Sequence, residues 1–189
     1  MAGKHWKHFC RQEKNINSKH FTIKMELTIK DAGTADIPLI QELTDKIWRP
    51  TYQHILTPEQ IDYMINLMYS SASLSRQMDE LHHHFILLYE GSKAIGFAAY
   101  STTDIAGIYK LHKIYLDGSY QGRGVGKFLI NAVIDRVKAQ QAQILELDVN
   151  KYNKARYFYE KQGFIVVKEK DTDIGKGYLM NDYVMQKTL

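Results

Sequence analysis

Three glycines fall within five residues of this chain, at Gly122, Gly124 and Gly126. They follow a strand-like run and a turn, and a helical pattern of apolar residues comes after them. The first backbone amides of a helix have no partner inside the helix, and the helix dipole adds positive potential there. Arg123 and Lys127 add full positive charges beside those amides. The segment therefore predicts a site for a phosphate-bearing ligand rather than a plain flexible turn.

Two common phosphate-binding motifs do not fit this segment. A P-loop requires GxxxxGK[ST], but Gln121 replaces its first glycine and Phe128 replaces its metal-binding hydroxyl. The dinucleotide motif GxGxxG also fails, because a match that begins at Gly122 needs its last glycine where Lys127 stands. ATP hydrolysis and a Rossmann-type cofactor are therefore poorly supported.

Three consecutive histidines, His82, His83 and His84, raise the question of a metal site. The first and the last of them would share a face if the segment were a strand. However, the nearby acids are limited to Asp79 and Glu80, and no cysteine is close in the sequence. We therefore expect a polar strand entrance here and no bound metal.

The elements that must position these side chains are predicted from hydrophobic periodicity. Strands are expected at residues 28–30, 85–89, 94–101, 108–116, 144–149, 164–168 and 178–187. Helices are expected from Thr34 or Asp36 to Pro50, from Thr57 onward, after the glycine segment, and from about Asn153 to Gln162. The order β-αα-βββ-α-β-α-ββ predicts an α/β domain with a mixed sheet.

The 189 residues, 44% of them hydrophobic, suffice for one domain with a buried core. Residues 1–24 carry six Lys or Arg and one Glu without clear periodicity, so we expect a basic, flexible N-terminal extension. The domain proper is expected at residues 25–189, where 19 basic and 20 acidic residues nearly balance. This balance argues against a nucleic-acid-binding core.

The single cysteine, Cys10, excludes an internal disulfide framework and favours a cytoplasmic setting. No apolar run approaches the roughly 20 residues needed to span a bilayer, and the N-terminus lacks the apolar region of a signal peptide. We therefore expect no association with a membrane.

Three stretches are informative when they are taken together. Residues 111–117 read LHKIYLD, residues 121–126 read QGRGVG, and residues 155–164 read ARYFYEKQGF. The second resembles the [QR]-x-x-G-x-[GA] pyrophosphate loop of the GNAT acetyltransferase superfamily, and the third resembles its A-x-x-[FL]-Y-E-K-x-G-F signature. The first resembles the family strand that runs alongside pantetheine. The resemblance covers about residues 25–189 and implies a mostly antiparallel mixed sheet with helices on both faces.

This resemblance implies acetyl-CoA as the co-substrate. Seven loop residues are implied to hold its pyrophosphate: Gln121, Gly122, Arg123, Gly124, Val125, Gly126 and Lys127. The backbone of Ile114, Tyr115 and Leu116 is implied to pair with pantetheine as if it were an added strand. Asn153 and Lys161 are further implied contacts, although Asn153 stands two residues before Ala155, where three is commoner in the family.

Acetyl transfer to an amine needs a neutral amine and a proton for the departing thiolate. A lysine-like amine has a pKa of about 10.4, so a base is useful. Tyr159 stands at the place of the family's general acid, with a structural helix tyrosine as the alternative. His112 is similar to a histidine implicated as base in some arylalkylamine acetyltransferases, and Asp148 matches an acidic base of protein-N-terminal acetyltransferases. Either residue, or water alone, can serve as the base.

Within the superfamily the chain resembles PaiA-type spermidine/spermine N-acetyltransferases in its runs KIYL and SYQGRGVGK and in its final QKTL. A polyamine pocket should present carboxylates, and the available ones are Asp62, Asp79, Glu80, Asp104 and Asp148. Trp48 and Tyr52 are expected in the acceptor pocket, with core packing as the alternative.

We therefore expect an N-acetyltransferase that moves an acetyl group to a small primary amine by direct attack in a ternary complex. The alternatives are a protein or peptide N-acetyltransferase and a non-catalytic acetyl-CoA-binding regulator. The sequence leaves open whether the chain forms a homodimer.

Overall fold

The computed structural model describes residues 26–189, and the predicted basic extension at residues 1–24 lies outside them. The described chain forms one seven-stranded sheet in the order β1-β2-β3-β4-β5-β7-β6. Only β4 and β5 pair in parallel among these strands, so the predicted mixed, mostly antiparallel sheet is confirmed. The strands are β1 (Leu27–Ala32), β2 (His84–Glu90), β3 (Lys93–Thr102), β4 (Ile108–Leu116), β5 (Ile144–Asn150), β6 (Ile165–Gly175) and β7 (Tyr178–Thr188).

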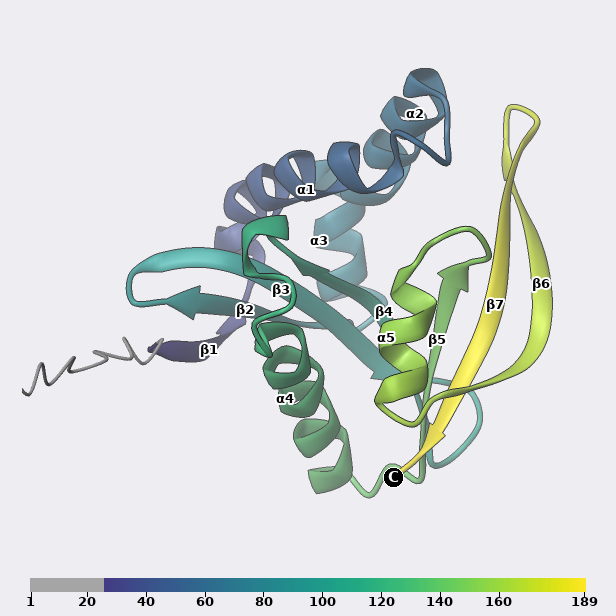
Figure 1. Cartoon of the computed structure of the whole chain (residues 1–189). Coiled ribbons are helices and arrows are strands. Elements are labelled where there is room, and N and C mark those ends of the chain that lie inside the picture. The colour runs from purple at the N-terminus through teal and green to yellow at the C-terminus, as the bar shows by residue number, and fades with distance from the viewer. Residues whose placement is uncertain (1–25) are drawn as a thin grey trace, which may run out of the picture.

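Helices cover both faces of the sheet, with α1, α2 and α3 on one face and α4 and α5 on the other (Figure 1). Thr57 begins α2 as predicted, because its hydroxyl accepts a hydrogen bond from the Gln60 amide at 3.2 Å. None of the helices in residues 26–189 is long and apolar enough to cross a membrane. The helices are α1 (Ile37–Tyr52), α2 (Pro58–Tyr69), α3 (Ser71–Asp79), α4 (Val125–Ala139) and α5 (Ala155–Lys161).

Each face of the sheet has its own hydrophobic core. The α4 core contains fully buried side chains such as Leu129 and Val133 of α4 and Leu145 of β5. The α1–α3 core contains Ile40 of α1 and Leu74 of α3, packed on β2 and β3. Burying one such aliphatic side chain stabilises the fold by roughly 1.5–3 kcal/mol, so the two cores fix the helices on the sheet.

Two helix predictions were wrong. Helix α1 does not end at Pro50 but runs to Tyr52, because a proline in the last turn removes one backbone hydrogen bond while its neighbours keep theirs. The Gln53 amide still bonds the Arg49 carbonyl at 3.0 Å. Three helices rather than two lie between β1 and β2. The third, α3, was not predicted because its sequence is mostly polar and only one of its apolar residues, Leu74, is fully buried.

A β-bulge interrupts the pairing of β3 with β4. Ala99 pairs with Lys113 and Tyr100 pairs with Leu111, so His112 has no partner on β3. The His112 ring stacks on His83 and Lys113 bonds Gln77 of α3, so both side chains lie on the α1–α3 side. Ile114 and Leu116 pack on the α4 core instead. Simple alternation along residues 112–116 predicts that His112 shares a face with Ile114 and Leu116, and this prediction is wrong because the extra residue of the bulge changes the alternation.

Strands β4 and β5 separate along their length. They pair only from Ile108 to Leu111 on β4 and from Ile144 to Leu147 on β5. Both strands continue, to Leu116 and Asn150, without pairing to each other. The edge of residues 112–116 that faces β5 is therefore open in the described structure.

Candidate active site

The glycine segment is held in place by Asp117, the first residue after β4. One carboxylate oxygen accepts hydrogen bonds from the amide and hydroxyl of Ser119, at 3.0 and 2.8 Å. The other carboxylate oxygen pairs with Lys46 of α1 at 2.5 Å. The hydrogen bond from Lys46 lowers the pKa of this buried carboxyl to about 2. The turn that begins the loop is thus tied to α1.

The loop presents a row of free amides. Within the described chain, the backbone amides of residues 122–127 have no hydrogen-bond partner, and the next amide, that of Phe128, bonds the Gly124 carbonyl. Gly122 and Gly124 have φ values of +74° and +81°, which favour glycine. A Cβ added at either glycine would have no heavy atom within 4 Å, so the protein leaves open space beside these two residues. This geometry is an anion-binding site at a helix N-terminus.

Two cationic side chains belong to this loop. Arg123 and Lys127 have no ion-pair partner among residues 26–189, so both are available to a ligand phosphate. The Arg123 guanidinium lies 5.3 Å from the centroid of the Tyr120 ring. Lys161 is exposed at the end of α5 and makes no hydrogen bond in the described structure.

The loop, the open end of β4 and helix α5 meet at Gly126. A Cβ on this glycine would contact the Phe158 ring at 3.5 Å and the Leu116 side chain at 3.9 Å. The residues predicted for the pyrophosphate and those predicted for pantetheine are therefore neighbours. The free amides lead directly to the open edge of residues 114–116.

A cluster of aromatic side chains lies where β4 and β5 separate. Trp48 and Tyr52 of α1 have ring centroids 4.5 Å apart, and Trp48 and Tyr115 of β4 are 6.0 Å apart. Trp48 is buried, whereas Tyr52 is half-buried. The Tyr52 hydroxyl lies beside the side chains of Asn153 and Tyr115. Asn153 also accepts a hydrogen bond from the Ala155 amide at 2.9 Å, as expected of a residue that caps α5.

Tyr159 of α5 borders this cluster. It is 8% exposed, and burial raises its pKa well above the ordinary value, with a smaller contribution from Tyr52. The hydroxyl therefore stays protonated at neutral pH and can donate a proton. Being protonated is the first requirement of a general acid, although the raised pKa itself makes the phenol a weaker donor.

His112, the bulged residue of β4, is in close contact with Ser101 and His83. Its Nε2 lies 2.9 Å from the Ser101 hydroxyl, and its ring stacks on His83 at a centroid distance of 3.8 Å. Burial lowers the pKa of His112 to about 3, with smaller contributions from His83 and Lys113. His112 is thus a neutral imidazole at physiological pH.

The three consecutive histidines point in different directions. His83 stacks on His112, while His84 stacks on Tyr100 at 5.4 Å, and His82 has a left-handed backbone with φ of +53°. Residues 26–189 contain no group of three side chains arranged to hold a metal ion.

Asp148 of β5 is paired with two cations. Its carboxylate lies 2.5 Å from Lys110 of β4 and 3.4 Å from Lys170 of β6. The other acids considered for a polyamine pocket lie elsewhere: Asp62 pairs with Arg49 and Glu80 with Arg76, while Asp79 and Asp104 are exposed. Of the five, only Asp148 lies at the separation of β4 and β5.

Asp182 of β7 is a buried acid that the sequence analysis did not single out. It is 4% exposed and lies opposite Asn150 of β5. Burial raises its pKa to about 6, and the negative charge of Asp148 adds to the effect. The signal in the sequence is one acid inside the strand-like run YLMNDYVM, where alternation alone does not mark it as buried.

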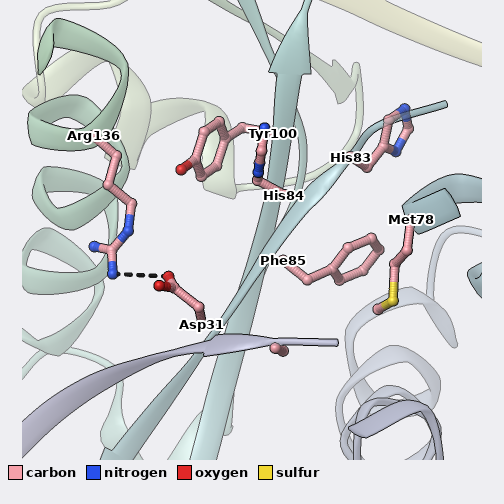
Figure 2. A pocket seen from close by; sticks show the side chains of 8 residues that line it. Asp31, Met78, His83, His84, Phe85, Tyr100 and Arg136 are labelled. Carbon is pink, nitrogen blue, oxygen red and sulfur yellow. Dashed lines mark hydrogen bonds and ion pairs between the residues drawn. The ribbon is translucent and has the colours of Figure 1, made fainter. Parts of the chain in front are cut away.

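Two hollows lie away from the loop. One, of about 300 Å³, opens between β1, β2 and α4, where Arg136 pairs with Asp31 at 3.2 Å and His84 faces Tyr100 (Figure 2). The other, of about 210 Å³, lies among the helices α1 and α2 and is crossed by the Arg49–Asp62 ion pair. Neither hollow contains a residue predicted from the family motifs.

Comparisons with known proteins agree with this geometry. The sequence profile of the Acetyltransferase (GNAT) domain matches residues 53–187. The [ribosomal protein bS18]-alanine N-acetyltransferase of Haemophilus influenzae is 37% identical over 91 residues, which are 48% of this chain and 58% of that protein. An N-acetyltransferase of Methanocaldococcus jannaschii is 34% identical over 101 residues, 50% of this chain and 42% of that protein. The chain thus spans about half the length of these curated relatives.

A solved structure matches over most of the chain. The PaiA N-acetyltransferase of Thermoplasma acidophilum, in complex with coenzyme A, has a TM-score of 0.73 and 27% identity. The match covers 87% of this chain and all of that chain.

Proposed function

This chain belongs to the GNAT acetyltransferase family, and from that premise we propose that it transfers an acetyl group from acetyl-CoA to a primary amine. One observation carries the proposal: six consecutive free amides, at residues 122–127, adjoin an open strand edge at residues 114–116. A pyrophosphate followed by an amide-bearing arm is the ligand that matches both features.

The residues present fit acetyl-CoA. The loop amides, with Arg123 and Lys127, would bind the pyrophosphate, and the open space beside Gly122 and Gly124 lets a phosphate approach the backbone. The backbone of residues 114–116 would pair with the amides of pantetheine. The similar PaiA structure, which contains coenzyme A, supports this assignment.

We assign the proton donor to Tyr159. The amine nitrogen attacks the thioester carbonyl carbon, the carbon–sulfur bond breaks, and the sulfur takes the proton of the Tyr159 hydroxyl. The Tyr159 phenol carries its proton at neutral pH, so a proton is present for this step. Asn153 and Tyr52 would orient the reacting groups, because both lie beside the aromatic cluster.

The acceptor is proposed to be a small amine such as a polyamine, on the likeness to the PaiA enzyme. The relative named as a ribosomal-protein alanine N-acetyltransferase favours a second candidate, the amino terminus of a protein. Both acceptors are primary amines that are cationic in water.

The release of CoA thiol from acetyl-CoA tests this proposal, with spermidine, phenylethylamine and a short peptide bearing an N-terminal alanine as acceptors. Amine-dependent thiol release supports the enzyme, and the preferred acceptor identifies its class. Tight binding of acetyl-CoA without release above background would favour a non-catalytic regulator instead.

A further inference from the structure

Asp182 is a mostly buried acid on β7, opposite the end of β5. Asp182 is 4% exposed, yet it makes no hydrogen bond and no ion pair within residues 26–189. Its neighbours on β7 show where it points: Met180 packs with the α1–α3 core, whereas Tyr183 and Met185 pack with the α4 core. Because side chains alternate along a strand, Asp182 faces the α1–α3 side.

The lysines near Asp182 are all engaged by other carboxylates. Lys110 pairs with Glu146 and Asp148, and Lys170 pairs with Asp148. Lys151 pairs with Glu169 at 2.7 Å and with Asp171 at 3.5 Å. Asp182 feels the charge of these three lysines but lies within ion-pair distance of none. Asp182 therefore has no cation in direct contact within residues 26–189, and a cationic ligand could fill that role.

Tyr52 connects this carboxylate with the predicted acid. Asp182 lies opposite Asn150 in the sheet, the Asn153 backbone amide donates to the Asn150 carbonyl at 2.9 Å, and the Tyr52 hydroxyl lies beside Asn153. The charge of Asp182 acts on Tyr52, and that of Tyr52 acts on Tyr159. The β6–β7 hairpin that carries Asp182 is attached to α2, because the Tyr63 hydroxyl donates to the Ile174 carbonyl at 2.5 Å. The end of the β6–β7 hairpin therefore lies near α2 (Figure 1).

We propose that Asp182 binds the ammonium group of the acceptor amine beside Tyr52 and takes its proton before acetyl transfer. This inference rests on the proposed function and names the charge class of its acceptor. A cationic amine supplies the missing counter-charge, whereas a neutral or anionic acceptor leaves the carboxylate unpaired.

Asp182 and Tyr159 together account for every proton that moves in the reaction. The ammonium gives one proton to the Asp182 carboxylate, and the resulting neutral amine attacks the thioester carbon. The carbon–sulfur bond breaks, and Tyr159 protonates the leaving sulfur. The nitrogen then loses its second proton to the Tyr159 phenolate, and Asp182 releases its proton to water. The products are the acetamide, CoA thiol and one proton.

The earlier candidates for the base are engaged in other contacts. Asp148 is paired with Lys110 and Lys170, and His112 is stacked on His83 with its Nε2 at the Ser101 hydroxyl. Asp182 alone among these three has no partner in the described structure. It is also the one for which burial, with the charge of Asp148, brings the pKa to about 6, close to the working range of a base.

Calorimetric titration tests the proposal without turnover. CoA is bound first, and spermidine, phenylethylamine or the alanine peptide is then titrated into the CoA complex. The proteins compared are the wild type, Asp182→Asn, Asp182→Glu and Asp135→Asn. Asp135 is an exposed residue of α4, so its variant removes the same charge far from the site. We expect Asp182→Asn to weaken amine binding about thirtyfold or more, while Glu restores it and CoA affinity stays unchanged.

Equal amine affinity in the wild type and Asp182→Asn would overturn the proposal, and so would failure of all three amines to bind the wild-type CoA complex. The CoA titration reports separately on the proposed function, because that function fails if CoA does not bind. In turnover, Asp182→Asn should remove the acidic limb of the kcat/KM profile near pH 6. The titratable and charged groups that act on Asp182 are Asp148, Lys110, Lys170, Lys151 and Tyr52. If His112→Ala removed that limb and Asp182→Asn kept it, His112 would be the base.

Discussion

The imidazole rings of His83 and His112 lie in a stack, with centroids 3.8 Å apart and planes inclined by 12°. Two cationic rings would repel each other at this distance, and both rings are also partly removed from water. Burial is the main cause that lowers the pKa of His83 to about 4 and that of His112 to about 3. The stack joins the start of β2 to the bulge of β4 only while both rings are neutral.

This stack predicts that the protein loses stability in mild acid. The unfolded chain takes up protons on these histidines near pH 6.5, whereas the folded chain does so only near pH 4 and below. Stability should therefore fall as the pH drops from about 6.5 toward 4, because the unfolded state binds more protons there. Urea unfolding at several pH values measures this slope, and His83→Gln should flatten it. The exposed residue His54 provides the control, and an equal slope in His83→Gln and His54→Gln would contradict the prediction.

Asp117 predicts a second loss of stability at lower pH. Its pKa is lowered to about 2 by Lys46 and Ser119, so its contribution is complete above about pH 4 and is lost as the pH falls toward 2. Asp117→Asn keeps an oxygen for the Ser119 amide but removes the charge. We expect it to reduce the free energy of unfolding at pH 7 by roughly 2 kcal/mol. Asp31→Asn, which breaks an exposed pair with Arg136, should change it by less than about 1 kcal/mol. Similar losses in the two variants would show that the turn does not depend on this buried charge.

Much of the fold could be predicted because its strands and most helices carry strong local patterns. The strand at Ile108–Leu116 was predicted with its observed bounds, and the helix start at Thr57 was marked by its cap and by Pro58. The bulge at His112 could not be predicted, because it depends on how β3 and β4 pair across the sheet. Helix α3 lacks an apolar stripe of its own and is held by tertiary contacts of Leu74.

The site divides in the same way. The loop residues 121–127 form a local motif, so the free amides were predictable from glycines and cations at a helix entrance. Asp182 was not predictable, because its burial and lack of a partner result from neighbours that the chain brings from β5, β6 and α1. Asp148 illustrates the reverse, because nothing in LELDVN indicates that Lys110 would pair with it.

Gly124 predicts a selective effect on acetyl-CoA binding. Its φ is +81°, so Gly124→Ala strains the loop by roughly 1 kcal/mol and places a methyl group in the open space beside the loop. We expect at least a tenfold loss of acetyl-CoA affinity in a calorimetric titration. Gly177→Ala is the matched control, because Gly177 has a φ of +77° and open space around it but lies in the β6–β7 hairpin. If both variants lost stability and neither lost affinity, the loop would not be the phosphate site.

Tyr159 predicts a loss of turnover without a loss of binding. Removing its hydroxyl in Tyr159→Phe leaves the departing thiolate without a proton donor, while the ring still fills its place in the α4 core. We expect kcat to fall about a hundredfold or more, the usual contribution of a general acid, with the affinity for acetyl-CoA unchanged. Tyr157→Phe is the matched control, because Tyr157 lies on the same helix with 63% of its surface exposed. Thiol release measures both variants, and a Tyr159→Phe enzyme that keeps the wild-type kcat would assign the proton donor to another residue or to water.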